Sequence, residues 1–153
     1  MDNIDKKILE ELQKNSSQPL SELSKKVGLS NTPCWNRIKK LEEEKIIKSK
    51  SIIIDNKKIN LSITVFLSIS IQNHTTEWLK NFQKVVNKYD QIIEVHRLTG
   101  SNSDYQITIL SPSIEEYDNF QQRLIKEIEC TNMSSHISLH TIKKNYKYPL
   151  DFI

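Results

Sequence analysis

Apolar residues in the first part of the chain recur every three or four positions, which predicts short amphipathic helices. The first helix is expected over residues 3–15, with Asp2 and Asp5 at its start, because carboxylates suit the free N–H groups there. Its buried stripe consists of Ile4, Ile8, Leu9 and Leu12. A second, shorter helix follows Pro19 and ends at Gly28, where the backbone needs freedom that a side chain would deny.

A third helix is expected over residues 31–44, with Ser30 as its N-cap. At about 100° per residue, Cys34, Ile38 and Leu41 share the face that packs on the first two helices. The opposite face is polar and basic, and it is therefore available to base edges and phosphates. A helix, a glycine-containing turn and a helix with an unburied face are typical of a helix-turn-helix DNA-binding domain.

From residue 62 onward the hydrophobic period switches between two and 3.6, which predicts alternating strands and helices. The expected elements are strands over 62–72, 92–99, 104–110 and 135–142, and helices over 77–89 and 114–128. The order β, α, β, β, α, β predicts an α+β fold of the ferredoxin-like type, an antiparallel sheet with both helices on one face.

The sheet face without helices also carries apolar side chains, and it needs cover. The residues expected on it are Phe66, Leu98, Leu110 and Ile142. Burial against a second copy of the same sheet would cover them, so the pattern predicts a homodimer.

The domain division that follows has three parts. Residues 1–48 form the helix-turn-helix domain, and residues 49–61 form a linker with a short strand at Ile52–Ile54. Residues 62–153 form the ferredoxin-like domain.

Composition narrows the class of protein without identifying it. The formal charge of +3 is too small to indicate a nucleic-acid partner by itself, although the positive excess is concentrated between residues 20 and 50. No apolar stretch approaches the ~18 residues of a membrane span, and the N-terminus does not resemble a signal sequence. We therefore expect a cytoplasmic protein with no membrane partner.

Catalytic and metal-binding motifs are absent from the sequence. There is no GxSxG, phosphate loop or HExxH pattern, the four histidines are scattered, and Cys34 and Cys130 belong to no CxxC cluster. We expect no enzyme, no catalytic residue, no metal site and no cofactor.

Two features of the first domain leave alternatives open. The three helices are also compatible with a plain bundle whose lysines face water. Trp35 lies on the flank of the third helix, where packing is favoured over contact with nucleic acid.

The stretch LSNTPCWNRIKKLEEEKII, residues 29–47, together with HRLTGSNSDYQI, Ile142 and the near-terminal YPL, resembles the Lrp/AsnC family of feast/famine transcriptional regulators over nearly the whole chain. The resemblance implies a winged-type helix-turn-helix and an AsnC-type (RAM) second domain. It also implies dimers that assemble further, for example into octamers, with pseudo-palindromic double-stranded DNA sites and an amino acid as effector.

The sequence departs from that family at two positions. The family usually has glycine just after the recognition helix, where this chain has Lys45, so the helix end is expected to be rebuilt. Three residues separate Gly100 from Asp104 where two are common, so the effector loop is expected to differ in shape.

The candidate sites follow from these patterns. The residues expected to contact DNA are Asn31, Thr32, Asn36, Arg37, Lys39, Lys40 and Lys48. Those expected to bind an effector are Thr99, Gly100, Ser101, Asn102 and Asp104, because a tight loop offers backbone N–H groups to a carboxylate and Asp104 can accept an ammonium group. Two other functions remain open: an enzyme on this architecture that resembles the siroheme decarboxylases, and an architectural DNA-binding protein indifferent to effectors.

Overall fold

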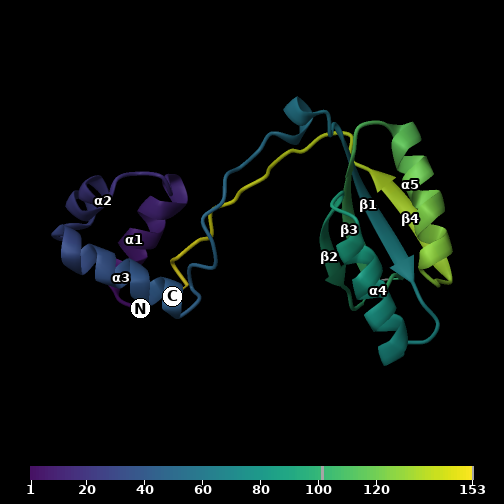
Figure 1. Cartoon of the computed structure of the whole chain (residues 1–153), viewed down its shortest axis with the longest axis horizontal. Helices are drawn as coiled ribbons and strands as arrows, with labels where there is room; N and C mark the ends of the chain where they lie inside the picture. Colours follow the sequence, from purple (N-terminus) through teal and green to yellow (C-terminus); the bar gives the residue numbers. More distant parts are fainter. Residues whose placement is uncertain (101, 153) are drawn as a thin grey trace. The chain divides into compact units, whose positions relative to one another are not determined.

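A computed structural model describes residues 1–100 and 102–152 of the chain, which divide into two compact units (Figure 1). The first unit contains Met1–Ile53 and Ile142–Ile153, and the second contains Ile54–Thr141. The chain therefore leaves the first unit after its helices and returns to it near the C-terminus.

The first unit contains three helices around one small core. They are α1 (Asn3–Lys14), α2 (Leu20–Val27) and α3 (Asn31–Glu43). The buried residues are Ile8, Leu9, Leu23, Val27, Cys34, Ile38 and Leu41. The predicted helices and the predicted core face of α3 are thus confirmed to within a residue or two.

Local interactions fix where these helices begin and end. Asp2 and Asp5 form a capping box, in which Asp2 accepts from the Asp5 N–H and Asp5 accepts from the Asp2 N–H. Gly28 ends α2 in the left-handed conformation with φ of 73°, and the next N–H, of Leu29, donates to the carbonyl of Ser24. Ser30 is the N-cap of α3, as predicted, although its side chain makes no capping hydrogen bond.

The C-terminal segment forms part of the first unit, a grouping that differs from the domain division expected from the sequence. Gln13 on α1 holds this segment through its amide, which donates to the Tyr148 carbonyl and accepts from the Tyr148 N–H. Leu150 packs against the helical core. The pairing joins residues 135 positions apart, which no local pattern could indicate.

The end of α3 is not rebuilt, and that prediction is wrong. Lys45 takes the left-handed conformation with φ of 57°, and the N–H groups of Ile46 and Ile47 both donate to the carbonyl of Leu41. The helix end keeps the geometry that suits glycine, and the lysine carries the strain.

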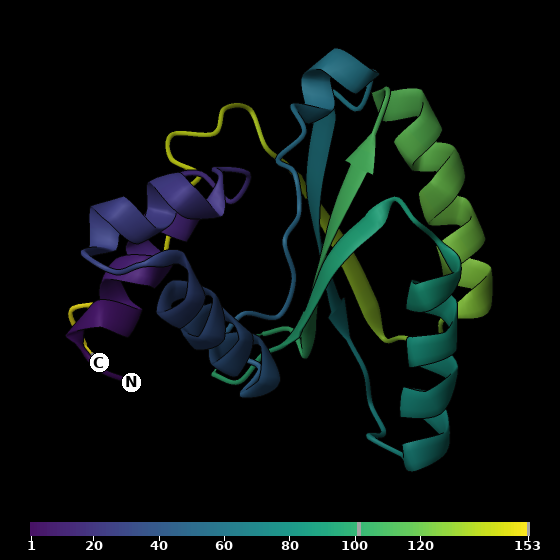
Figure 2. The ribbon, with the colours of Figure 1, turned by 60° about the vertical axis from the view of Figure 1, so that its left-hand side comes forward.

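The second unit is an antiparallel sheet with two helices on one face (Figure 2). Its strands are β1 (Ile63–Ser70), β2 (Ile92–Arg97), β3 (Tyr105–Ser111) and β4 (Asn132–Ile137), in the order β2-β3-β1-β4. Its helices are α4 (Thr76–Lys88) and α5 (Ile114–Glu127), and a short 3-10 helix, Asn56–Ile59, precedes β1. The ferredoxin-like prediction is confirmed.

Alternation along the central strands builds the core of this unit. Val65, Leu67 and Ile69 of β1 are fully buried, and so are Ile107 and Ile109 of β3. The helices cover them with Phe82, Val85, Tyr117, Phe120 and Leu124.

Two strand predictions are wrong. Residues 52–54 form no strand, because they pair with no neighbouring strand. The three isoleucines remain exposed. The last strand ends at Ile137 and not at residue 142, and Ile142 is 90% exposed and belongs to the first unit. β-branched residues favour extended backbone, but only a partner edge makes a strand.

The sheet face opposite the helices keeps part of its predicted apolar character. Phe66 is 36% exposed on it, whereas Leu98 and Leu110 are half-buried. The paired neighbours of Phe66 there are Thr108 and His136. The face is therefore a mixed polar and apolar surface with one exposed aromatic ring.

In the part of the chain that the structure describes, no helix has the length and apolar character needed to span a membrane.

Replacing Lys45 by glycine is expected to stabilise the first unit. Glycine adopts positive φ without the Cβ clash, so Lys45→Gly should raise the free energy of unfolding by about 0.5–1 kcal/mol. Hydrogen exchange of the α3 amides measures this gain. Lys45→Ala is the matched control, because it removes the same charge and keeps the Cβ. An equal gain from Lys45→Ala would contradict the backbone explanation.

Candidate functional site

The outward face of α3 presents polar and basic side chains to solvent. Thr32, Asn36, Lys39 and Lys40 are all exposed, on the side of the helix away from its core-facing residues. Their hydroxyl, amide and ammonium groups are the kinds of group that bind base edges and phosphates. The structure thus brings together four of the residues predicted to contact DNA.

Arg37 lies on one flank of α3 and ties that helix to the start of α1. Its guanidinium donates to Asp2 at 2.7 Å and to Asp5 at 2.8 Å, and its side chain is 31% exposed. These carboxylates raise the pKa of Arg37. Arg37, predicted to contact DNA, is thus placed as a support between α1 and α3.

The carboxyl of Asp2 is shifted strongly by the same arrangement. The backbone N–H of Asp5 and then the side chain of Arg37 lower the pKa of Asp2 from 3.8 to about 2. The folded start of α1 therefore favours the charged form of the Asp2 carboxyl.

Asn31 occupies the first turn of α3 and links it to α2. The hydroxyl of Ser24, which is 2% exposed, donates to the Asn31 side-chain oxygen at 2.7 Å. This contact spans the turn of the helix-turn-helix and fixes the spacing of the two helices. Asn31 is exposed as a whole, so its amide nitrogen stays accessible from solvent.

Carboxylates balance several of the lysines at the end of α3. Glu42 accepts from Lys39 at 2.8 Å and from Lys50 at 3.1 Å, and Glu44 lies 3.8 Å from Lys40. The hydrogen bond to Glu42 raises the pKa of Lys39 above its ordinary value. Lys48 is exposed after the helix. Exposed pairs of this kind are weak and exchange readily for phosphate contacts.

Trp35 does not pack into the core, contrary to the interpretation favoured from the sequence. Its side chain is 50% exposed, and the ammonium of Lys39 lies 5.8 Å from its ring centroid. The core of this unit is small and already filled by Cys34 and Ile38, so the large indole remains at the surface.

The predicted effector residues lie around the β2–β3 turn. Thr99, Gly100 and Asn102 are exposed, and Gly100 has φ of 78°. Ser70 of β1 donates to the Asn102 carbonyl at 2.8 Å. Ser101, also predicted, lies outside the described residues.

Asp104 holds the segment that connects β1 to α4. Its carboxylate accepts from the Ile71 N–H at 2.8 Å and lies 3.1 Å from His74 Nε2. The Ile71 hydrogen bond, followed by the contact with His74, lowers the pKa of Asp104. Asp104 therefore already has two partners, and its side chain is 30% exposed.

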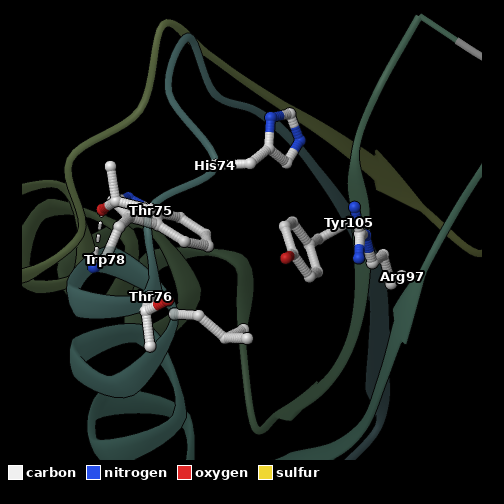
Figure 3. Close-up of a pocket in the computed structure, with 7 residues that line it drawn as sticks. His74, Thr75, Thr76, Trp78, Arg97 and Tyr105 are labelled. Carbon is white, nitrogen blue, oxygen red and sulfur yellow. Dashed lines mark hydrogen bonds between the residues drawn. The ribbon is translucent and has the colours of Figure 1, made fainter.

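A small pocket of about 110 Å³ opens beside His74, at the N-terminal end of α4 (Figure 3). Trp78 and Tyr105 project toward each other in it, with ring centroids 5.3 Å apart, and Arg97 comes from the end of β2. Among the described residues Arg97 forms no direct ion pair, although its charge contributes to lowering the pKa of Asp104. The pocket thus combines an aromatic wall with a cation.

From the sequence, the effector was expected on the hairpin, and either His96 or Arg97 of the preceding strand was a candidate to line its pocket or the subunit interface; Trp78 and Tyr105 were not included. Arg97 and Tyr105 pair across β2 and β3, so their side chains share the helix-covered side of the sheet. Trp78 lies near the start of α4 and packs against the edge of the core, and it therefore also reaches the pocket. The sequence signal that could have indicated the pocket was Arg97, a cation at the last position of the edge strand β2, opposite the aromatic Tyr105.

These two surfaces define a DNA-binding regulator with a separate sensing domain, and the comparisons with known proteins agree. Residues 1–48 match the model for winged helix-turn-helix DNA-binding domains, and residues 64–148 match the Lrp/AsnC ligand binding domain. The chain belongs to the Lrp/AsnC family of transcriptional regulators.

Several characterised proteins are similar over nearly the whole chain. The glutamate uptake regulatory protein of Zymomonas mobilis is 38% identical over 98% of this chain and 91% of its own length. The DNA-binding transcriptional activator DecR of Escherichia coli is 32% identical, with 99% of each chain covered. These relatives carry names of transcriptional regulators and not of enzymes.

Solved structures agree with the fold. An AsnC family transcriptional regulator from Agrobacterium tumefaciens has a TM-score of 0.94 and 41% identity, covering 100% of this chain and 99% of its own. A Neisseria meningitidis transcriptional regulator in complex with L-Met has a TM-score of 0.93 and 27% identity, covering 99% and 98%.

The pKa of Asp2 sets an acid limit on the contact between α1 and α3. Because folding depresses this pKa, the stabilisation is fully present above about pH 4 and is lost as the pH falls through about 2. An NMR titration of the Asp2 carboxyl should show a midpoint of about 2. In Arg37→Gln the midpoint should rise but stay below 3.8, since the Asp5 N–H remains. An unchanged midpoint in that variant would show that the ion pair does not form in solution.

Proposed function

We propose that α3 is the helix that reads the DNA sequence, and that the second unit senses an α-amino acid. The observation that carries the first part is the exposed polar face of α3, held in place from the opposite side by its core contacts and by Arg37. A rigid helix with a free polar face is what major-groove recognition requires.

The roles of the individual side chains follow from their surroundings. Thr32 and Asn36 are exposed with no ion-pair partners to displace, and they bind base edges. Lys39, Lys40 and Lys48 bind phosphates. Asn31 assists from the first turn while it holds α2. Arg37 has its carboxylate partners, and it contributes mainly by positioning α3.

The proposed effector site joins the hairpin to the neighbouring pocket. Thr99, Gly100, Ser101 and Asn102 supply the loop, and Arg97 supplies a cation for the carboxylate of the amino acid. Asp104 orients His74 at the edge of this pocket and can share its charge with the ammonium group. Ligands that dock there would act directly on the connection between β1 and α4.

The sheet face that carries Phe66 is proposed to pair with a second copy of the chain. A solvent-exposed aromatic ring among half-buried leucines favours burial, and a symmetric copy supplies a matching surface. Such dimers would place two α3 helices on a pseudo-palindromic site, and higher assemblies such as octamers would set the spacing between sites. We place the protein in the cytoplasm, where its DNA is.

The DNA-binding roles can be separated by their dependence on sequence and on salt. Asn36→Ala should relax base preference at one position of a selected duplex, with a loss of about 1–3 kcal/mol for the preferred base. Lys40→Ala should weaken binding to all duplexes alike and reduce the slope of log K against log salt by about 1. Electrophoretic mobility or fluorescence anisotropy at several salt concentrations measures both.

The two variants serve as controls for each other, since they lie on the same exposed face of α3. Absence of any sequence-selective complex at low salt would refute reading by α3. Equal behaviour of both variants would refute the division of roles.

The effector proposal predicts a ligand-dependent rise in stability. At least one free amino acid should raise the melting temperature by several degrees at saturating concentration, because binding to the folded state alone stabilises it. Arg97→Gln and Asp104→Ala should each remove that rise. Differential scanning fluorimetry across the twenty amino acids provides the measurement.

Arg123→Gln is the matched control, because Arg123 belongs to the same unit and lies over the Phe120 ring, away from the pocket. It should retain the full response. A flat response of the unaltered protein to all twenty amino acids would favour a DNA-architectural role without an effector.

A further inference from the structure

Trp35 is the largest apolar side chain exposed on α3, and neither the core nor the proposed base and phosphate contacts use it. Half of its surface is accessible to solvent. It lies one position after the buried Cys34 and is flanked on the helix surface by Thr32 and Lys39, at spacings of three and four residues. An indole thus adjoins the face that we assign to DNA.

The two flanks of α3 differ in what covers them. The Arg37 flank is closed by the carboxylates of α1, at 2.7 and 2.8 Å. On the Trp35 flank the contact with the indole is the ammonium of Lys39, 5.8 Å from the ring centroid. Lys39 itself is drawn toward Glu42, at 2.8 Å. A DNA duplex approaching the exposed face therefore meets the accessible half of the Trp35 indole, with Lys39 beside it.

The major groove offers one apolar group to such a side chain, the C5 methyl of thymine. The other groups on its floor are hydrogen-bond donors and acceptors, which an aromatic face cannot satisfy. Burying the indole against a methyl removes two apolar surfaces from water together. Lys39, beside the ring, can exchange its exposed pair with Glu42 for the adjacent phosphate.

We propose that Trp35 is a specificity-determining residue that selects thymine at one position of each half-site by contact with its methyl group. The proposal rests on the assignment of α3 as the reading helix and adds a contact that carries sequence information without a hydrogen bond. Asn36 and Thr32 would read neighbouring positions through polar groups.

Replacing thymine by uracil tests the contact directly, because uracil lacks only the methyl group. A duplex is first selected from a randomised library with the full-length protein, and each thymine of one half-site is then replaced singly by uracil. The unaltered protein should lose about fourfold in affinity at one position, the effect of one buried methyl group. Trp35→Ala should bind the thymine and uracil duplexes equally at that position.

Two variants keep the test decisive. Asn36→Ala should retain the methyl effect while losing preference elsewhere. Trp35→Phe keeps an apolar ring and should retain part of the effect even if Trp35→Ala folds poorly, which circular dichroism would reveal.

Three results would overturn the proposal. Binding of the unaltered protein to selected DNA with no contribution from any thymine methyl would leave DNA reading intact and remove only the role of Trp35. Methyl discrimination retained by Trp35→Ala at unchanged affinity would mean that another residue makes the contact. Equal weakening of Trp35→Ala on thymine and uracil duplexes, with discrimination retained, would indicate contact with the sugar-phosphate backbone instead.

Discussion

The five helices and the two central strands, β1 and β3, each bury one apolar face, and this constraint decides which surfaces remain free. The first unit buries one side of α3 through Cys34, Ile38 and Leu41, so the opposite side must face solvent. The second unit buries the helix-covered face of its sheet, so the Phe66 face stays open. The surfaces that we assign to DNA and to a second copy of the chain are the sides that the two cores leave uncovered.

Apolar packing brings the helices and strands into contact. Hydrogen bonds and ion pairs then fix how these elements are oriented. Arg37 joins α3 to the two carboxylates that also cap α1, so one cluster starts a helix and positions the reading helix. Asp104 has a similar double role in the second unit, where it fixes the Ile71 N–H and His74 next to the pocket. In both units a partly exposed carboxylate connects the fold to the candidate site.

The lysines near α3 are mostly paired with carboxylates, and this pairing limits how much each lysine contributes to DNA binding. Most lysines of the α3 region have a carboxylate within reach, including Lys39 with Glu42 and Lys40 with Glu44. Binding therefore exchanges internal pairs for phosphates, and the net gain from each lysine is small. Selectivity then depends on uncharged groups of the same face, among which Thr32, Asn36 and Trp35 are exposed.

The sequence by itself determined the element order, the two cores and the exposed face of α3, because periodicity reports which side of an element is apolar. It gave no sign that Gln13 would hold Tyr148, or that Arg37 would turn to α1, since these contacts join distant positions. It also misplaced Trp35 and the last strand. Only the tertiary structure decides such points, because the room left in a core and the presence of a partner strand depend on the packing of the whole unit.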